Sequence, residues 1–415
     1  MSTIDEKWTN KGRAKRRGSK TLLFIMAGCV SYAVFTYRAL YTRIISSAPT
    51  IEFNHQPEPR SMNSVISPHM EALINRTRFQ LALNSSSPPT IYFCEPKYQD
   101  FFRLISDMFP EYQIDDESLA REKYWYKGLK FKESTEYDLF VSKYDYACPA
   151  SGSNWLLSKF RGQFIWVTAE SYPYPRIRGV PDDQRHHVVG PSIGGVHDFP
   201  LTYLQMVWWD AYRHILPPHV MVDGNLRPKG NRTHFLIYAQ NNCVPHRNKA
   251  FGLLSSIGRA HHSGKCGAPK GYDNVERVRA GINSYNWKRN AEHYSNYRFC
   301  LVMEHSYDPE VPYYVTEKIL LAFVGGCIPI YYGSPDVIFD MFNKNAFVFF
   351  NVSDPILSLE LVKNLENNTQ MYDEMISEPI LANGNETVKK YFSFSDEIGN
   401  GWLKYQFRSK LNLLH

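Results

Sequence analysis

The chain has 415 residues, of which 43% are hydrophobic and 15% are aromatic. This composition excludes an intrinsically disordered protein, and the length favours two globular domains with additional segments over one core. The formal net charge of +6 would suit an acidic partner. Much of the excess positive charge lies in the first twenty residues, so the charge does not indicate nucleic-acid binding.

A basic segment precedes an uncharged one at the N-terminus. Seven Lys and Arg residues lie within residues 1–20, and residues 21–37 carry no charge before Arg38. A span of this length is at the short limit for a transmembrane helix. We expect a cytosolic tail at 1–20 and a signal-anchor helix at 21–38, with the remainder in the lumen by the positive-inside rule. The alternatives are a nuclear localisation signal or a signal peptide cleaved near Ser46 and Ala48.

Residues 39–89 are rich in Ser, Pro and Asn and have no sustained apolar period, which predicts a luminal stem. Beyond the expected helix the number of cysteines is even, which permits disulfides but leaves the pairing open. These residues are Cys94, Cys148, Cys243, Cys266, Cys300 and Cys327. Sequons that would accept N-linked glycans in a secretory protein occur at Asn75, Asn84, Asn231, Asn351, Asn367 and Asn385.

From residue 90 onward, short apolar runs alternate with longer helical patterns. The first series predicts strands at 90–94, 137–141 and 163–168 and a helix at 201–215. The second predicts strands at 234–239, 298–303, 328–332 and 346–350 with helices at 248–257, 316–324 and 356–364. This alternation indicates an α/β fold with two Rossmann-like domains facing a cleft, at 90–228 and 229–415. Ligands are then expected at the carboxyl ends of the strands.

Several common motifs are missing from the sequence. It contains no Gly-x-Gly-x-x-Gly, no His-Glu-x-x-His and no Asp-x-Asp. The first would indicate a dinucleotide site and the second a zinc site. We therefore predict no metal site and no required cofactor.

The most informative block is at 297–350. A predicted strand ends in Glu304 and His305, and a helix then opens at Thr316, Glu317 and Lys318. A helix N-terminus offers free N–H groups to an anion, and Lys318 adds a charge that could reach a pyrophosphate. A Thr followed by Glu is also an ordinary helix start that needs no ligand, so these residues alone do not decide between the two.

Longer strings in this block resemble a known signature. YVTEK at 314–318 and IPIYYGSP at 328–335 follow a strand that ends in MEHS. Together they resemble the donor-binding signature of the α1,3/4-fucosyltransferases, glycosyltransferase family ten, which are Golgi type II membrane proteins. The resemblance implies a GT-B fold and inverting transfer of L-fucose from GDP-fucose to a GlcNAc hydroxyl, most often in α1,3 linkage. The alternatives are another nucleotide-sugar-dependent GT-B transferase and a catalytically silent luminal glycan-binding protein.

The resemblance implies that the domain at 90–228 is on the acceptor side and that the domain at 229–415, with its C-terminal tail, binds GDP-fucose. It also implies roles for individual residues. Glu170, in FIWVTAESYPYPR at 164–176, matches the general base, and the alternatives for that role are Asp182, Asp183 and Glu304. His305 stands where the family has Asn, and the loop before YVTEK is longer than usual. The implied donor-binding residues are Arg247, Tyr314, Glu317 and Lys318, with Glu304 and His305 as further candidates.

The resemblance implies partners as well. They are GDP-fucose, a glycan acceptor on a glycoprotein or oligosaccharide, and the Golgi membrane through one N-terminal helix. A homodimer is left open, nucleic acid is not expected, and a divalent metal is not strictly needed.

Overall fold

The computed structural model describes residues 88–94, 99–115, 134–143, 159–169, 180–191, 193–228, 230–278, 289–411 and 413. None of the helices within these ranges is both long and apolar enough to cross a bilayer. The expected cytosolic tail, the expected anchor and all but the end of the expected stem lie outside the described residues.

The N-terminal sheet has six parallel strands in the order β2-β1-β3-β4-β5-β6. Strands predicted at 90–94, 137–141 and 163–168 correspond to β1, β3 and β4. Helix α3 (Gln99–Met108) follows β1. The strands are β1 (Thr90–Cys94), β2 (Gln113–Ile114), β3 (Leu139–Lys143), β4 (Gln163–Val167), β5 (His186–Gly190) and β6 (Phe199–Pro200).

Strand β5 was not predicted, because its sequence HHVVG begins with two residues that are usually polar. Both are buried. The His186 ring stacks on Phe164 with centroids 4.7 Å apart. His187 Nδ1 lies 3.0 Å from the carbonyl oxygen of His197, and His187 Nε2 lies 3.0 Å from Oε1 of Gln163. Burial lowers the pKa of His187 to about 4, so this histidine is neutral in the folded protein near pH 7.

The C-terminal sheet also has six parallel strands, in the order β12-β11-β10-β7-β8-β9. This is the doubly wound order of a Rossmann fold, and it reverses between β7 and β10. The two predicted parallel-sheet α/β domains are therefore confirmed. The strands are β7 (His234–Gln240), β8 (Ala260–Gly264), β9 (Val275–Arg277), β10 (Tyr297–Leu301), β11 (Ile328–Tyr331) and β12 (Val348–Phe349).

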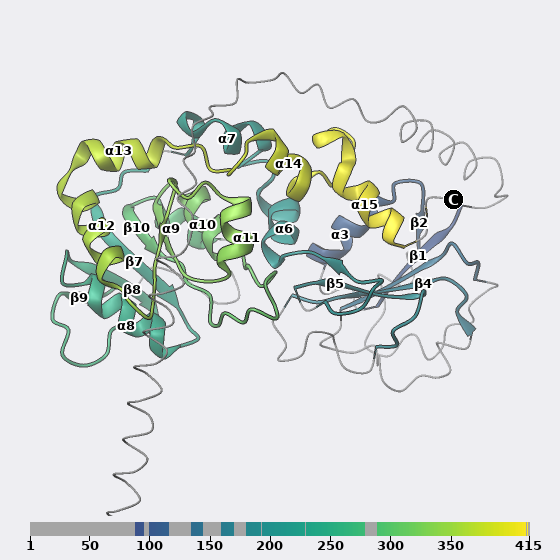
Figure 1. Cartoon of the computed structure of the whole chain (residues 1–415), viewed down its shortest axis with the longest axis horizontal. Coiled ribbons are helices and arrows are strands. Elements are labelled where there is room, and N and C mark those ends of the chain that lie inside the picture. Colours follow the sequence, from purple (N-terminus) through teal and green to yellow (C-terminus); the bar gives the residue numbers. More distant parts are fainter. Residues whose placement is uncertain are drawn as a thin grey trace, which may run out of the picture. The chain divides into compact units, whose positions relative to one another are not determined.

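Helices connect and cover these strands (Figure 1). The second half of the chain contains α8 (Pro245–Leu254), α9 (Asn290–Tyr294), α10 (Lys318–Gly325), α11 (Pro335–Met341), α12 (Ile356–Asn367), α13 (Thr369–Ser377), α14 (Asn385–Phe392) and α15 (Trp402–Lys410). In the sequence, the segment between β6 and β7 contains α6 (Tyr203–Val207), a π-helix at Trp208–Tyr212, α7 (Pro218–Val222) and a 3-10 helix at Gly224–Leu226.

The helix predicted at 201–215 is shorter in the structure, and it changes from an α-helix to a π-helix along its length. Thr202 caps α6 with a capping box to Gln205, and the chain then continues as a π-helix at Trp208–Tyr212. The wider turn coincides with two large side chains that both find acceptors. The Trp208 indole donates to the Leu216 carbonyl at 2.9 Å, and the Trp209 indole donates to Asp107 Oδ2 at 2.8 Å.

The last helices of the chain pack on residues of the first domain. The Phe407 ring of α15 lies 5.0 Å from that of Phe199 and 6.1 Å from that of Phe109, and Arg408 pairs with Glu111. Figure 1 accordingly shows α15 beside α3. The C-terminal segment thus contributes to the core around the N-terminal sheet.

Candidate functional site

The candidate site lies where the strand order of the C-terminal sheet reverses. β7 and β10 are neighbours there, and each is followed by an irregular segment, at 241–244 and 302–317 respectively. A doubly wound sheet has a crevice at the carboxyl ends of its strands at this point, and ligands bind there. The residues that follow these two strands are therefore the first to consider.

Arg247 is brought to this edge by the start of α8. Pro245 is the first helical residue, a position that suits its fixed φ and missing N–H, and Arg247 lies in the same turn with only 1% of its surface exposed. Burial lowers the pKa of Arg247, and the helix dipole also disfavours a cation in the first turn. A buried guanidinium at this position requires compensation.

The partners of Arg247 in the described part of the chain are neutral oxygens. Nε donates to the carbonyl of Glu304 at 3.1 Å. Nη1 is 3.5 Å from both Oε1 of Gln240 and the carbonyl oxygen of Asn242. Carbonyls satisfy its hydrogen bonds, and no carboxylate in the described ranges lies within ion-pair distance of it. The nearby charges of Glu304 and Glu317 raise its pKa but offset the effect of burial only in part. The arrangement suits an anion with two oxygens, such as a phosphate.

The Glu304 carboxylate, fully buried, organises the other side of the site. Its Oε1 accepts from the backbone N–H of Thr316 at 2.8 Å, and the Thr316 hydroxyl lies 2.9 Å from Oε1 and 2.8 Å from Oε2. Tyr331 Oη is 3.4 Å from Oε1, and burial followed by the charge of Glu304 raises the pKa of this phenol well above its usual value. Through these contacts the Glu304 carboxylate positions Thr316 and Tyr331.

Lys318 lies above this carboxylate at the start of α10. Its Nζ donates to Thr316 Oγ1 at 2.7 Å and lies 3.4 Å from Glu304 Oε2 and 3.9 Å from Glu317 Oε1. The predicted helix began at Thr316, whereas α10 begins at Lys318 because Thr316 is held by Glu304. The Lys318 side chain is 17% exposed, and its ammonium group is held in place by Thr316 and Glu304.

His305 and Tyr314 form a hydrogen-bonded pair next to these cations. Tyr314 Oη is 2.7 Å from His305 Nδ1. Burial lowers the pKa of His305, and the positive charges of Arg247 and Lys318 lower it further, so this imidazole is neutral near pH 7. His305 therefore offers hydrogen bonds to a ligand but no third positive charge.

The residues that follow β11 pack closely against Glu304. A Cβ atom on Gly333 would lie 2.2 Å from Tyr331 Oη and 2.9 Å from Glu304 Cγ. Only glycine fits between them. The backbone N–H of Glu304 donates to the Tyr332 carbonyl at 2.7 Å, which joins the exits of β10 and β11.

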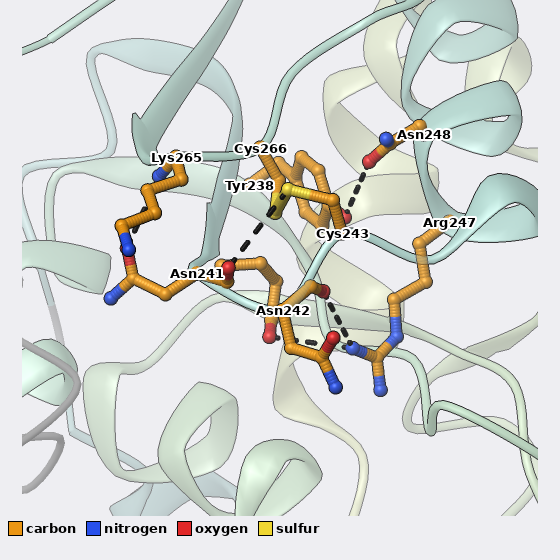
Figure 2. Close-up of a disulfide and its surroundings, with 9 residues drawn as sticks. Tyr238, Asn241, Asn242, Cys243, Arg247, Asn248, Lys265 and Cys266 are labelled. Carbon is orange, nitrogen blue, oxygen red and sulfur yellow. Dashed lines mark hydrogen bonds between the residues drawn. A yellow bond between two sulfur atoms is a disulfide. The ribbon is translucent and has the colours of Figure 1, made fainter.

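A disulfide fixes the loop that carries the Arg247 contacts. Cys243, in the loop after β7, is bonded to Cys266, which follows β8, with Cα atoms 5.1 Å apart. Figure 2 shows the guanidinium of Arg247 pointing toward Asn242 in this loop, and Asn241 Oδ1 accepting from the Lys265 backbone N–H at 3.1 Å. The bond therefore ties the exits of β7 and β8 together beside the buried arginine.

A second disulfide joins Cys300 on β10 to Cys327, the residue before β11. Cys148 lies outside the described residues. Asn231, Asn351, Asn367 and Asn385 are exposed, as glycan attachment requires, whereas Asn75 and Asn84 fall outside the described ranges. Within those ranges no three His, Cys, Asp or Glu side chains lie close enough to hold a metal ion.

The structure brings together most of the residues that the sequence singled out at this edge, namely Arg247, Glu304, His305, Tyr314, Glu317 and Lys318. Glu170 lies outside the described residues, just beyond the end of β4. Of the alternatives, Asp183 Oδ1 is 2.7 Å from His186 Nδ1. Sequence reasoning missed His246, whose Nε2 lies 3.1 Å from the Glu304 carbonyl oxygen. Its position next to Arg247 was the only signal.

Comparison of sequences finds relatives that match part of the chain. No protein-family model matches. A putative fucosyltransferase, R654, of Acanthamoeba polyphaga mimivirus is 31% identical over 169 residues, which are 40% of this chain and 26% of the relative. The α1,3-fucosyltransferase FucT of Helicobacter pylori is 33% identical over 144 residues, covering 34% and 26%. An α1,4-fucosyltransferase of Arabidopsis thaliana is 32% identical over 127 residues, covering 27% and 29%.

The matched segments span little more than a quarter of the length of these relatives. They confirm the sequence resemblance to the α1,3/4-fucosyltransferases. Among solved structures, an α1,3-fucosyltransferase aligns with a TM-score of 0.49 at 19% identity, covering 80% of this chain and 93% of that one. An α1,3-fucosyltransferase in complex with GDP-fucose aligns with a TM-score of 0.47, covering 80% of this chain and 92% of that one. A DNA-modifying β-glucosyltransferase gives 0.43 at 10% identity over 78% and 99%.

Replacing Glu304 tests whether its carboxylate holds the site together. Glu304→Ala leaves the N–H and hydroxyl of Thr316 without their acceptor and Lys318 without its buried partner. We expect it to lower the free energy of unfolding by about 3–5 kcal/mol. Urea unfolding measures this change, with Glu310→Ala, an exposed glutamate in the following loop, as the matched control. Equal stability of the two variants would contradict the role given to Glu304.

Proposed function

We propose that this chain transfers L-fucose from GDP-fucose to a GlcNAc hydroxyl of a glycan, in α1,3 linkage and with inversion at C1. The observation that carries the proposal is the buried guanidinium of Arg247 at the strand-order reversal, where its partners are neutral carbonyl oxygens. The charges of Glu304 and Glu317 offset its burial only in part, and a diphosphate would add negative charge beside it. The relatives named as fucosyltransferases support the choice of donor.

In this proposal each donor-binding residue has a part. Arg247 offers paired N–H donors to phosphate oxygens, and Lys318 offers a point charge from the start of α10. Glu317, with a side chain 14% exposed, accepts from ribose hydroxyls in this proposal. His305 and Tyr314 adjoin both cations and complete the wall of the donor site.

The proposed reaction is a single displacement. Glu170, three residues beyond the last residue of β4, takes the proton from the acceptor hydroxyl. The acceptor oxygen then forms its bond to C1 of fucose while the bond from C1 to the phosphate oxygen breaks, which inverts C1. GDP leaves with the additional negative charge, and Arg247 and Lys318 stabilise it as preorganised positive groups. In this account a divalent metal is not strictly required.

A panel of donors tests the function directly. The full chain, solubilised in detergent, is incubated with GDP-fucose, GDP-mannose and UDP-galactose and with a mixture of N-glycans, and product mass is measured. We expect a deoxyhexose increment from GDP-fucose alone, unchanged by a chelator. Lys318→Ala should reduce the transfer rate at least about tenfold, since about 1.4 kcal/mol of leaving-group stabilisation is lost.

The matched control is Lys363→Ala, an exposed lysine on α12, which should transfer normally. Transfer from another donor would replace the proposed donor. GDP binding without any transfer would favour a silent glycan-binding protein, and activity abolished by the chelator would contradict metal independence.

We also propose a GT-B type arrangement anchored in the Golgi membrane by a single N-terminal helix, with a stem and a luminal catalytic part. The basic segment at 1–20, the uncharged segment that follows, the two disulfides and the exposed sequons support this orientation. Protease treatment of sealed microsomes should remove only the tail and leave a protected, endoglycosidase-sensitive fragment. Complete digestion would contradict a luminal location.

A further inference from the structure

A hollow of about 670 Å³ is lined in part by the loop at 302–317, which also carries residues of the candidate donor site. One wall contains Phe199 and Pro200 of β6, and α11, α14 and α15 supply most of the remaining wall. Pro312 and Tyr313 also line it, and the residue after Tyr313 is Tyr314, which contacts His305. Adjacent residues of one loop therefore contribute to the hollow and to the candidate donor site, and the volume of the hollow lies in the range of small-molecule sites.

Three side chains in this hollow are available to a ligand. Trp402, the first residue of α15, is 37% exposed although it is a large aromatic residue. Asp336 on α11 and Gln406 on α15 are exposed. Neither forms a side-chain hydrogen bond or ion pair with another residue in the described part of the chain. In contrast, Asp340 is already paired with Lys390 at 2.5 Å.

The hollow continues into a second one of about 250 Å³. The two share Asp340, Lys390 and Trp402, so the ion pair and the indole stand between them. The second is lined further by Asn383 and Glu386 and their neighbours on α14. We call the two hollows together the α11–α15 groove. Its extent suits a ligand longer than one sugar.

The charge of the groove favours a neutral ligand. The carboxylates of Asp336, Asp340 and Glu386 face the ammonium groups of Lys389 and Lys390, three negative charges against two positive ones. An anion would meet a net repulsion here, whereas a hydroxyl-rich ligand can donate to the free carboxylate of Asp336. An exposed indole offers an apolar surface with a polar edge, which matches the apolar face and hydroxyl rim of a sugar ring.

We infer that the α11–α15 groove binds the acceptor oligosaccharide, holding the sugars beyond the one that receives fucose. This inference rests on the proposed function and adds where the acceptor lies and that a neutral glycan is preferred. Trp402 stacks on one sugar ring, while Asp336 and Gln406 bind its hydroxyls. Contacts distant from the reacting hydroxyl position that hydroxyl for transfer.

The test measures glycan binding by the full chain in the presence of GDP. The probe is an array of neutral N-acetyllactosamine and N-glycan-core oligosaccharides together with the same glycans ending in an acidic sugar. We expect Trp402→Ala to weaken binding of neutral glycans at least about tenfold, Trp402→Phe to restore part of it, and GDP affinity to stay unchanged. Asp336→Asn should reduce the preference for neutral over acidic glycans, a change that a purely structural role would not produce.

Two controls keep these effects interpretable. Tyr137, 42% exposed, precedes β3 at the amino end of the N-terminal sheet, and Asp373 is exposed on α13. Tyr137→Ala and Asp373→Asn should leave both glycan and GDP binding unchanged, and thermal unfolding of every variant checks its fold.

The outcomes separate this inference from the proposed function. Normal glycan binding by folded Trp402→Ala and Asp336→Asn, or no glycan bound by a chain that binds GDP, would overturn the inference alone. Failure to bind GDP at all would instead overturn the proposed donor site.

Discussion

Both the backbone carbonyl and the side-chain carboxylate of Glu304 hold other residues of the site in place. Its carbonyl accepts from Arg247 and His246, which belong to the helix after β7. Its carboxylate accepts from Thr316 and lies beside Lys318, at the start of the helix before β11. Glu304, a single residue in the segment after β10, thus contacts two cations that come from different elements, Arg247 and Lys318. The arrangement of the site depends on these contacts.

Burial of these charged groups is unfavourable by itself. A buried carboxylate and a buried guanidinium lose hydration, and for Arg247 the nearby charges of Glu304 and Glu317 offset that loss only in part. An anion bound between Arg247 and Lys318 would offset that loss. Two features constrain this edge of the sheet: Gly333 has no room for a Cβ atom, and a disulfide holds the loop after β7. Such preorganisation is typical of a binding site.

Much of the architecture was predictable, because buried parallel strands form continuous apolar runs such as FLIYA in β7. Two of the strands that escaped prediction, β5 and β8, share one cause. Both β5 and β8 contain adjacent histidines, and polar residues within a strand conceal it unless their buried partners are known, as with His187 and Gln163. Likewise, the return of α15 onto Phe109 and Phe199 depends on long-range packing that no local pattern encodes.

The candidate site was likewise predictable only in part from the sequence. YVTEK marked Glu317 and Lys318, and the helix start marked Arg247. However, the sequence suggested that Thr316 caps its own helix, whereas it serves Glu304, and Glu304 itself was a candidate ligand group rather than a support. A contact between residues twelve positions apart requires the fold. The residue types were visible in advance, while their division into binding and positioning roles was not.

The most direct measurement is calorimetric titration of the full chain with GDP and with GMP, for the natural protein and for Arg247→Lys. If Arg247 and Lys318 hold a diphosphate, GDP should bind at least about tenfold more tightly than GMP, because the second phosphate adds charge-assisted hydrogen bonds. Arg247→Lys should narrow this difference, since an ammonium group cannot replace the paired donors of a guanidinium. Equal affinity for GDP and GMP, or a difference untouched by Arg247→Lys, would contradict the account.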